Sequence, residues 1–115
     1  MLSKDAILSS DDLPRERVDV PEWGGDVYVR TLTGTERDSF EQSMQGKKDK
    51  INLDNVRARF AVLTICDEAG TRIFNAADAA KLGSKSAAAL DRVFAVAQRL
   101  NGFSNEDEQK ILAGN

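Results

Sequence analysis

The chain has 115 residues, a length that suits one domain with a modest core. Hydrophobic residues make up 41% and aromatic residues only 6%, which predicts a folded protein with a mostly aliphatic core. The 16 basic and 19 acidic residues leave a net charge of −3. This balance disfavours nucleic acid as the main ligand, because phosphate binding needs a basic excess.

Three absences in the sequence narrow the function further. Histidine is missing, which removes the commonest general base and metal ligand and lowers the expectation of catalysis. The single cysteine, Cys66, excludes an internal disulfide, and we interpret it as a small buried side chain in a reducing compartment. No apolar run approaches the ~18 residues that cross a membrane, and the N-terminus makes a poor secretory signal.

The N-terminal part contains the expected strands. Residues 1–14 are interpreted as a loosely ordered lead-in that ends at a proline. Residues 17–32 alternate valines with charged residues around a glycine-containing turn, which predicts a β-hairpin. Trp23 lies in that turn, where it either covers the hairpin or anchors a partner. Gly24-Gly25 lacks the spacing and the lysine of a phosphate-binding loop, so it is interpreted as part of the turn.

Two helices are predicted next. The Thr33 hydroxyl and the Glu36 carboxylate can form a capping box for a surface helix to about Gln45. A lysine-rich loop follows at residues 46–50. Asn52 is expected to cap a second helix to about residue 65, whose apolar stripe is Leu53, Val56, Phe60 and Leu63.

Residues 67–74 have only a superficial likeness to a calcium loop. If Gly70 takes the sixth loop position, Ile65 falls where calcium requires an oxygen ligand. We therefore favour a turn, followed by a single bridge or a third strand at residues 72–74. Asn75 then caps a short helix that ends near Leu82.

The longest helical pattern runs over residues 84–100. One face of this helix is apolar at helical spacing, through Leu90, Val93, Phe94, Ala97 and Leu100. We expect it to pack on the helix at 53–65, which carries a matching stripe. Ser104 is expected to cap a peripheral C-terminal helix over 104–115, with a free end.

Together these elements predict a single α+β domain over residues 1–115, mostly helical, with an N-terminal β-hairpin followed by four or five helices. We find no pair of carboxylates and no nucleophile with a base that would indicate catalysis. We therefore expect no enzyme, and no metal or cofactor site. The side chains selected as candidates for binding a protein partner are Trp23, Tyr28, Phe40, Ile111 and Leu112.

Five segments of the chain carry a family resemblance: VDVPEWGG at 18–25, VYVR at 27–30, LTGTERDSFE at 32–41, CDEAGTRIF at 66–74 and KSAAALDRV at 85–93. They resemble segments of the tail assembly chaperones of long-tailed bacteriophages, including copies carried in prophages. The resemblance covers most of residues 15–105. The distinctive part is the VPEWGG segment together with the TGTER helix start.

The resemblance implies a non-enzymatic protein of the host cytoplasm. Such a protein binds and solubilises the tape measure protein, helps recruit tail tube subunits, and is absent from the finished virion. The family also implies a longer product made by frameshifting in many phages. Self-association is a further expectation, whereas nucleic acid, membranes and cofactors are not expected partners. Two alternatives remain: a structural tail or head-completion protein retained in the virion, and a small nucleic-acid-binding regulator.

Overall fold

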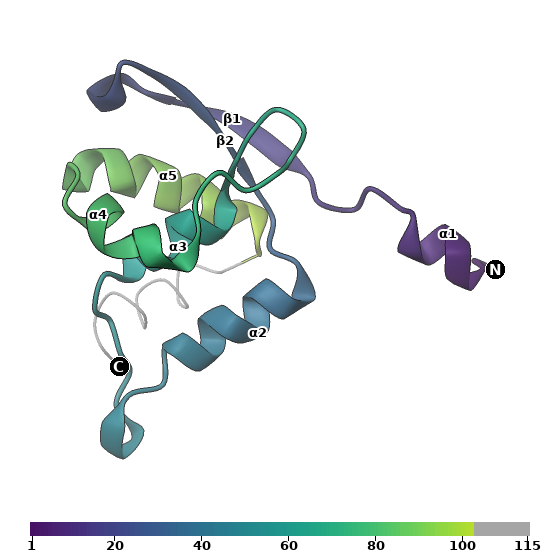
Figure 1. Cartoon of the computed structure of the whole chain (residues 1–115), viewed down its shortest axis with the longest axis horizontal. Coiled ribbons are helices and arrows are strands. Elements are labelled where there is room, and N and C mark those ends of the chain that lie inside the picture. The colour runs from purple at the N-terminus through teal and green to yellow at the C-terminus, as the bar shows by residue number, and fades with distance from the viewer. Residues whose placement is uncertain (103–115) are drawn as a thin grey trace.

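The computed structural model describes residues 1–102, without the side chain of Asp49. Within this range the chain forms five α-helices and a three-stranded antiparallel sheet, which confirms the predicted α+β class (Figure 1). The elements are α1 Lys4–Leu8, β1 Arg15–Val20, β2 Gly25–Arg30, α2 Gly34–Ser43, α3 Val56–Thr64, β3 Ile65–Cys66, α4 Ala79–Gly83 and α5 Ala87–Leu100. Three single 3₁₀ turns add to them: η1 Pro21–Trp23, η2 Lys47–Asp49 and η3 Ala76–Asp78.

The predicted hairpin is confirmed as β1 and β2, with Val18 opposite Val27 and Val20 opposite Gly25. Gly24 closes the turn with φ +75°, a backbone angle that suits glycine. Of the two alternatives predicted for residues 72–74, the single bridge is present, since Arg72 forms an isolated bridge with Cys66. The third strand of the sheet is β3, antiparallel to β2, and the sequence analysis did not predict it. β3 could not be predicted from the sequence, because its two residues directly follow α3 and are apolar like the buried residues of that helix.

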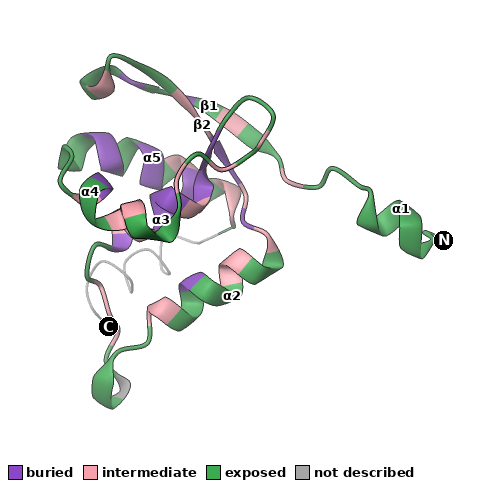
Figure 2. Ribbon diagram, in the orientation of Figure 1, coloured by how far each residue is buried: buried purple, intermediate pink, exposed green. Residues whose placement is uncertain are grey.

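The core lies between α3, α5 and one face of the sheet, where Figure 2 shows the buried residues gathered. α5 packs against α3 and also against β1 and β2, so it joins the helical layer to the hairpin. Phe60 stands at the centre of an aromatic chain: its ring centroid lies 4.8 Å from Phe40 and 5.6 Å from Phe94. The predicted packing of the two apolar stripes is confirmed.

The start of α3 corrects a prediction, because Asn52 does not cap it. The helix begins at Val56, after Asn55 in a left-handed conformation with φ 51°. The Asn52 side chain instead accepts a hydrogen bond from the Asp54 amide, within a turn that leaves Leu53 outside the helix. This loop is held by Arg59, whose guanidinium donates to the Asn52 carbonyl at 2.6 Å. The contact from Arg59 therefore determines the conformation of this loop, and the Asn52 side chain does not form the predicted helix cap.

The predicted caps at Thr33 and Asn75 are present. Thr33 and Glu36 form the capping box of α2, and Asn75 and Asp78 form one at η3. These contacts fix the starts of the two segments as the sequence indicates. The Ser86 hydroxyl, which the sequence analysis did not name, caps α5 by accepting from the Ala89 amide at 3.3 Å.

Both ends of the chain depart from simple expectations. The lead-in contains the short helix α1, which the sequence analysis omits; it extends away from the body and buries no residue (Figure 1). At the other end, Asn101 ties the end of α5 to the middle of the chain: its side-chain oxygen accepts from the Leu32 amide at 2.8 Å. The predicted helix at 104–115 and its free end lie outside the described residues.

Candidate functional site

An apolar groove lies between the hairpin turn, the loop after β3, and α4. Its volume is about 510 Å³, within the usual range for ligand sites of roughly 300–1,000 Å³. Trp23, Phe74 and Leu82 supply its apolar surface. Its charged lining consists of Glu22, Asp78, Lys81 and Lys85. We call this site the Trp23 groove.

The hairpin turn places Trp23 at the groove. Pro21 begins the 3₁₀ turn and Gly24 ends it, so the indole is held at a fixed point of the chain. Glu22 anchors the turn on α5, since its carboxylate accepts from Arg92 Nε at 2.9 Å. The backbone amide of Glu22 itself lowers the pKa of this carboxyl, and Arg92 lowers it further. The tip of the hairpin is thus attached to the helix that organises the core.

The indole of Trp23 is partly buried and packs against the core. This placement is what the covering interpretation predicts, yet the same ring lines the groove. Its Nε1–H group is buried and has no acceptor among the described residues. Buried tryptophan N–H groups usually do have one. The groove therefore combines apolar surface with a donor that an occupant could use.

The two lysines outweigh the one carboxylate, Asp78, that lines the groove without an ion pair in the described chain, so the unpaired charge there is net positive. Glu22 is paired with Arg92, and the Asp78 carboxylate accepts from the Asn75 amide at 2.9 Å. Lys81 and Lys85 form no ion pair within residues 1–102. The two lysines are thus available to carboxylates of an occupant, although exposed pairs of this kind contribute only about 0–1 kcal/mol each.

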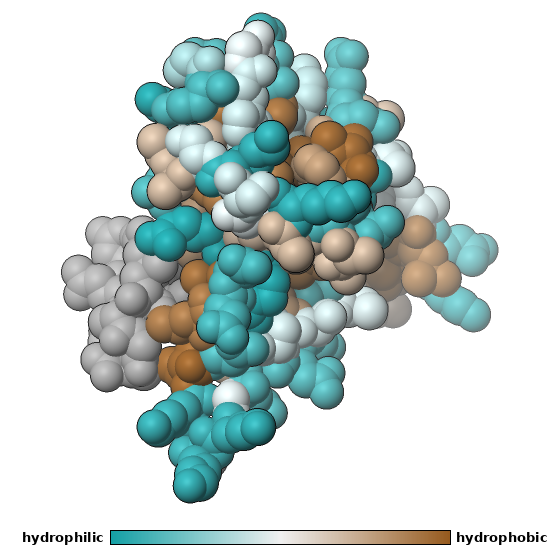
Figure 3. Space-filling model, turned by 60° about the vertical axis from the view of Figure 1, so that its left-hand side comes forward, coloured by the Kyte–Doolittle hydropathy of each residue, from teal (hydrophilic) through white to brown (hydrophobic). Residues whose placement is uncertain are grey.

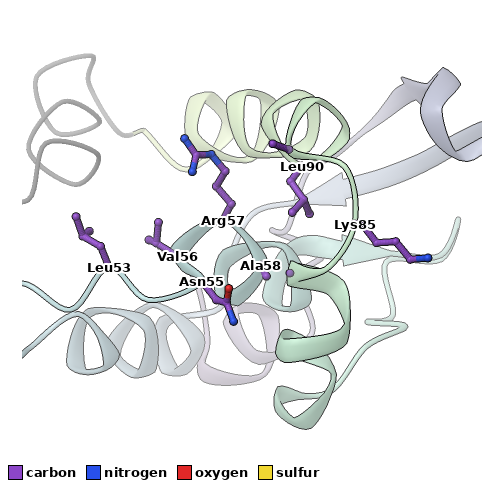
Figure 4. A pocket seen from close by; sticks show the side chains of 9 residues that line it. Leu53, Asn55, Val56, Arg57, Ala58, Lys85 and Leu90 are labelled. Carbon is purple, nitrogen blue, oxygen red and sulfur yellow. The ribbon is translucent and has the colours of Figure 1, made fainter.

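A smaller hollow of about 220 Å³ lies where α3 and α5 begin (Figure 4). Leu53, Val56 and Leu90 line it, and Arg57 crosses to α5, where its guanidinium pairs with Asp91. The end of α4 closes the other side tightly: a Cβ at Gly83 would lie 2.8 Å from the Asn55 side-chain oxygen. We therefore interpret this hollow as a gap in the packing between helices. The guanidinium of Arg57 at its edge is already paired with Asp91.

A buried ion-pair network joins β2, α2 and the loop after β3. Arg30 is 4% exposed and binds both oxygens of Glu36 at 2.9 Å, while Arg72 approaches the same carboxylate at 3.3 Å. Burial alone raises the pKa of Glu36, but the hydrogen bonds from Arg30 and the Thr33 amide, with both arginine charges, outweigh it. The pKa of Glu36 is therefore below its usual value, which makes this carboxylate a weak proton acceptor. Its role is to stabilise the fold through the ion pairs.

The sequence-based candidates fall in different places. Trp23 lies at the groove, and Tyr28 is half-buried in β2, where it pairs with Arg17 on one side and Cys66 on the other. Phe40 is 3% exposed, and its ring packs in the core against Phe60. Ile111 and Leu112 lie outside the described residues. A partner-binding role for any of the five stays a prediction.

The sequence analysis missed the residues of α4 and the preceding loop as site residues. Phe74 was interpreted only as part of a bridge or short strand, Lys81 and Leu82 as part of a short helix, and Lys85 as part of the long helix at 84–100. Their meeting with Trp23 depends on the packing of η1 against α5, which brings distant segments together. A lysine pair four residues apart beside an isolated leucine was the only signal in the sequence, and it is a weak one.

Among the described residues, no group of three or more histidine, cysteine or carboxylate residues could hold a metal ion. No helix of that part is long and apolar enough to span a bilayer. Cys66 is buried as predicted, and this burial raises the pKa of its thiol. A buried thiol with a raised pKa is a poor nucleophile.

The structure is a small α+β fold whose surface carries an apolar groove beside the hairpin turn. The chain belongs to the phage tail assembly chaperone family, whose model matches residues 3–111. Its structure is similar to that of the bacteriophage HK97 tail assembly chaperone, with a TM-score of 0.62 and 14% sequence identity. The match covers 88% of this chain and 95% of that one, and at this identity the likeness is one of fold. No curated protein matches the sequence.

Proposed function

We propose that this chain binds and solubilises the tape measure protein in the host cytoplasm and helps recruit tail tube subunits during tail assembly. Membership of the tail assembly chaperone family supports the general role. The observation that carries the specific proposal is the Trp23 groove, which offers apolar surface and two unpaired lysines on a fixed part of the fold.

The chemistry of the groove suits a helical client segment. An amphipathic helix can lay apolar side chains at every third or fourth position into such a groove. Trp23, Phe74 and Leu82 would receive them, while Lys81 and Lys85 would attract acidic residues beside them. The client we propose is therefore an apolar helix of the tape measure protein with acidic neighbours.

The distribution of apolar surface favours reversible binding. Figure 3 turns the left-hand side of Figure 1 forward and shows hydrophobic atoms in separate patches among hydrophilic ones. Obligate interfaces instead bury large continuous apolar areas. An assembly chaperone has to release its client, so small separate contacts are the more suitable arrangement.

Co-expression tests the proposal directly. We expect this chain to raise the soluble yield of the tape measure protein from the same genome, and Trp23→Ala to reduce that gain. Ile73→Ser is the matched control, because Ile73 is 55% exposed and does not line the groove. Thermal unfolding of each variant shows whether a loss of yield reflects misfolding. An unchanged insoluble fraction, with both proteins well expressed, contradicts the proposal.

The fluorescence of Trp23 gives a second readout on the purified protein. Partial burial predicts a blue-shifted emission for the isolated chain. Adding a helical peptide from the tape measure protein should shift the emission further, because the ring becomes enclosed and its N–H gains an acceptor. An emission spectrum that does not change at saturating client excludes the groove as the binding site.

The alternatives give different results. A tail or head-completion protein would be detected in purified particles, from which a chaperone is absent. A nucleic-acid-binding regulator would give a salt-sensitive shift of DNA, which the net charge of −3 disfavours. Either result, obtained without any gain in soluble tape measure protein, replaces the proposed function.

A further inference from the structure

A basic loop projects from the body of the protein beyond the end of α2, at the bottom of Figure 1. It consists of residues 45–51, and we call it the lysine loop. Lys47, Lys48 and Lys50 are exposed, and none of them forms an ion pair within residues 1–102. The chain as a whole carries a net charge of −3, so this loop is a basic spot on an acidic molecule. A local excess of positive charge of this kind attracts anionic groups to one place.

The lysine loop is a closed turn. A bridge joins Gln45 to Ile51, and the Gly46 amide donates to the Lys50 carbonyl at 2.6 Å. Gly46 has no room for a side chain, because a Cβ there would lie 2.4 Å from the same carbonyl oxygen. Lys48 has φ 55°, in the left-handed region that residues other than glycine seldom adopt. The three lysines are therefore presented by a defined turn and not by a simple run of charges.

One arginine of α3 holds the base of this turn. The Arg59 guanidinium donates to the Ser43 carbonyl at 2.9 Å and to the Asn52 carbonyl at 2.6 Å, and these two residues lie on opposite sides of the loop in the sequence. Burial lowers the pKa of Arg59, which shows that enclosing this charge is unfavourable. The enclosed arginine and the left-handed Lys48 are both costs that a simple connection between α2 and α3 would avoid. Such costs point to a use for the shape of the loop.

Two hollows lie against the lysine loop. The larger, about 670 Å³, is lined by Ile51 and Leu53 together with Lys47 and Lys50. The smaller, about 480 Å³, shares Ile51 and Lys50 and adds Met44. The three apolar side chains are half-buried, so part of each is open to a ligand. In Figure 3 the lowest projection of the molecule is hydrophilic, and hydrophobic atoms lie directly above it. Lysines and apolar surface are thus available side by side.

The hollows contain little opposing charge. Among their described lining residues Asp54 is the one carboxylate, and it lines the larger hollow only. Its charge already interacts with Arg59. The lysines of the loop therefore remain available to the carboxylates of a ligand.

We propose that the lysine loop and its two hollows bind an acidic segment of another protein that also presents apolar side chains. Carboxylates pair with the lysines, and the apolar side chains enter the hollows against Ile51 and Leu53. A protein suits the site better than nucleic acid, because the net charge of −3 repels polyphosphate and bare phosphates would leave the apolar surface unused. The site shares no lining residue with the Trp23 groove, so the inference goes beyond the proposed client contact and does not depend on it.

Fluorescence anisotropy with a labelled synthetic peptide tests the charge. The probe alternates glutamate with leucine, a pattern for an extended segment and not for the helix proposed for the Trp23 groove. We expect the parent to bind it, and the triple variant Lys47→Glu, Lys48→Glu, Lys50→Glu to bind about tenfold or more weakly, since three attractions become repulsions. The matched control Lys81→Glu, Lys85→Glu reverses the lysines of the Trp23 groove and should bind like the parent. A parent that does not bind, or a loss in the control and not in the triple variant, overturns the proposal.

Gly46→Ala separates the shape of the loop from its charge. It keeps all three lysines but places a methyl group against the Lys50 carbonyl, so the turn has to open. We expect this variant to bind the same peptide about threefold or more weakly. Gly34→Ala is the control, because a Cβ there meets nothing within 4 Å. Thermal unfolding checks that both variants are folded. Equal binding by Gly46→Ala and the parent would show that the lysines act as diffuse charge without a built site.

Changing the probe tests the class of ligand. A peptide with serine in place of leucine should bind more weakly than the first probe, because the hollows stay empty, and one with lysine in place of glutamate should not bind. The emission of Trp23, which reports on the groove, should not respond to any of these peptides. Equal binding of the serine and leucine peptides contradicts the role of the hollows. A single-stranded oligonucleotide that binds more tightly than the leucine peptide replaces the proposed partner by nucleic acid.

Discussion

Helices α1 and α5 begin in the same way and differ in what holds them. Each starts with a serine hydroxyl that accepts a hydrogen bond from an amide three residues later, Ser3 from Ala6 and Ser86 from Ala89. α5 buries six residues and contacts both α3 and the sheet, whereas α1 buries none. The cap determines where a helix starts, but burial of the apolar face determines whether the helix belongs to the folded body.

The largest effect is expected at the centre of α5. Phe94→Ala should lower the free energy of unfolding by about 3–5 kcal/mol, the usual range for a buried phenylalanine. Phe94 is 3% exposed and its ring packs edge-on against Phe60. Thermal and urea denaturation measure the change. A variant that melts like the parent would show that α5 is not the centre of the core.

A matched leucine pair sharpens the comparison of the two helices. Leu90→Ala in α5 should cost about 2–5 kcal/mol, since Leu90 is 5% exposed. Leu8→Ala in α1 should change the free energy of unfolding by less than about 0.5 kcal/mol, because Leu8 is 74% exposed. Both are measured by urea denaturation at low protein concentration, where self-association does not contribute. Equal costs at the two sites would mean that α1 packs on the body in solution.

The buried ion-pair network should produce an acid-sensitive component of stability. The pKa of Glu36 is lowered in the fold from its usual 4.5, so its contribution is present above that value and is lost as pH falls through the folded pKa. Glu36→Gln should cost about 1.5–3 kcal/mol at pH 7, because Arg30 loses a charged partner. The variant should also lose less stability than the parent between neutral pH and acid.

The matched control for Glu36 lies on the same helix. Glu41 pairs with Arg37 at 3.3 Å, but its side chain is 62% exposed. Glu41→Gln should therefore change the free energy of unfolding by well under 1 kcal/mol and leave the pH profile unaltered. If both variants respond to acid alike, the buried network is not the source of the pH dependence.

Local signals in the sequence identified much of the fold. The Thr33–Glu36 and Asn75–Asp78 boxes needed only residues three positions apart, and both are present. The apolar stripe over 84–100 identified α5 and its buried face, because the side chains that a helix buries recur every three or four residues in the sequence. The hairpin was found from alternation around a turn, although its strands begin at Arg15, two residues before the expected start.

Features that depend on distant contacts were missed. Arg59 draws the loop before α3 toward itself, so the helix starts at Val56 and not after Asn52. β3 becomes a strand only because β2 lies beside it. The groove needs Trp23, Phe74 and Leu82 to meet, and no spacing in the sequence indicates that they do. Of the five candidate site residues, only Trp23 lies at this groove among those described.

The attachment of the hairpin to α5 has a consequence during synthesis. Val18, Val20 and Val29 are buried, and the ion pairs of Glu16 with Arg99 and of Glu22 with Arg92 hold the hairpin on α5. The ribosome makes the hairpin early and α5 late, at roughly 5–20 residues per second. For several seconds each nascent chain therefore presents valines whose cover has not yet been translated. During that interval the protein is itself a candidate substrate for the folding machinery of the cell that makes it.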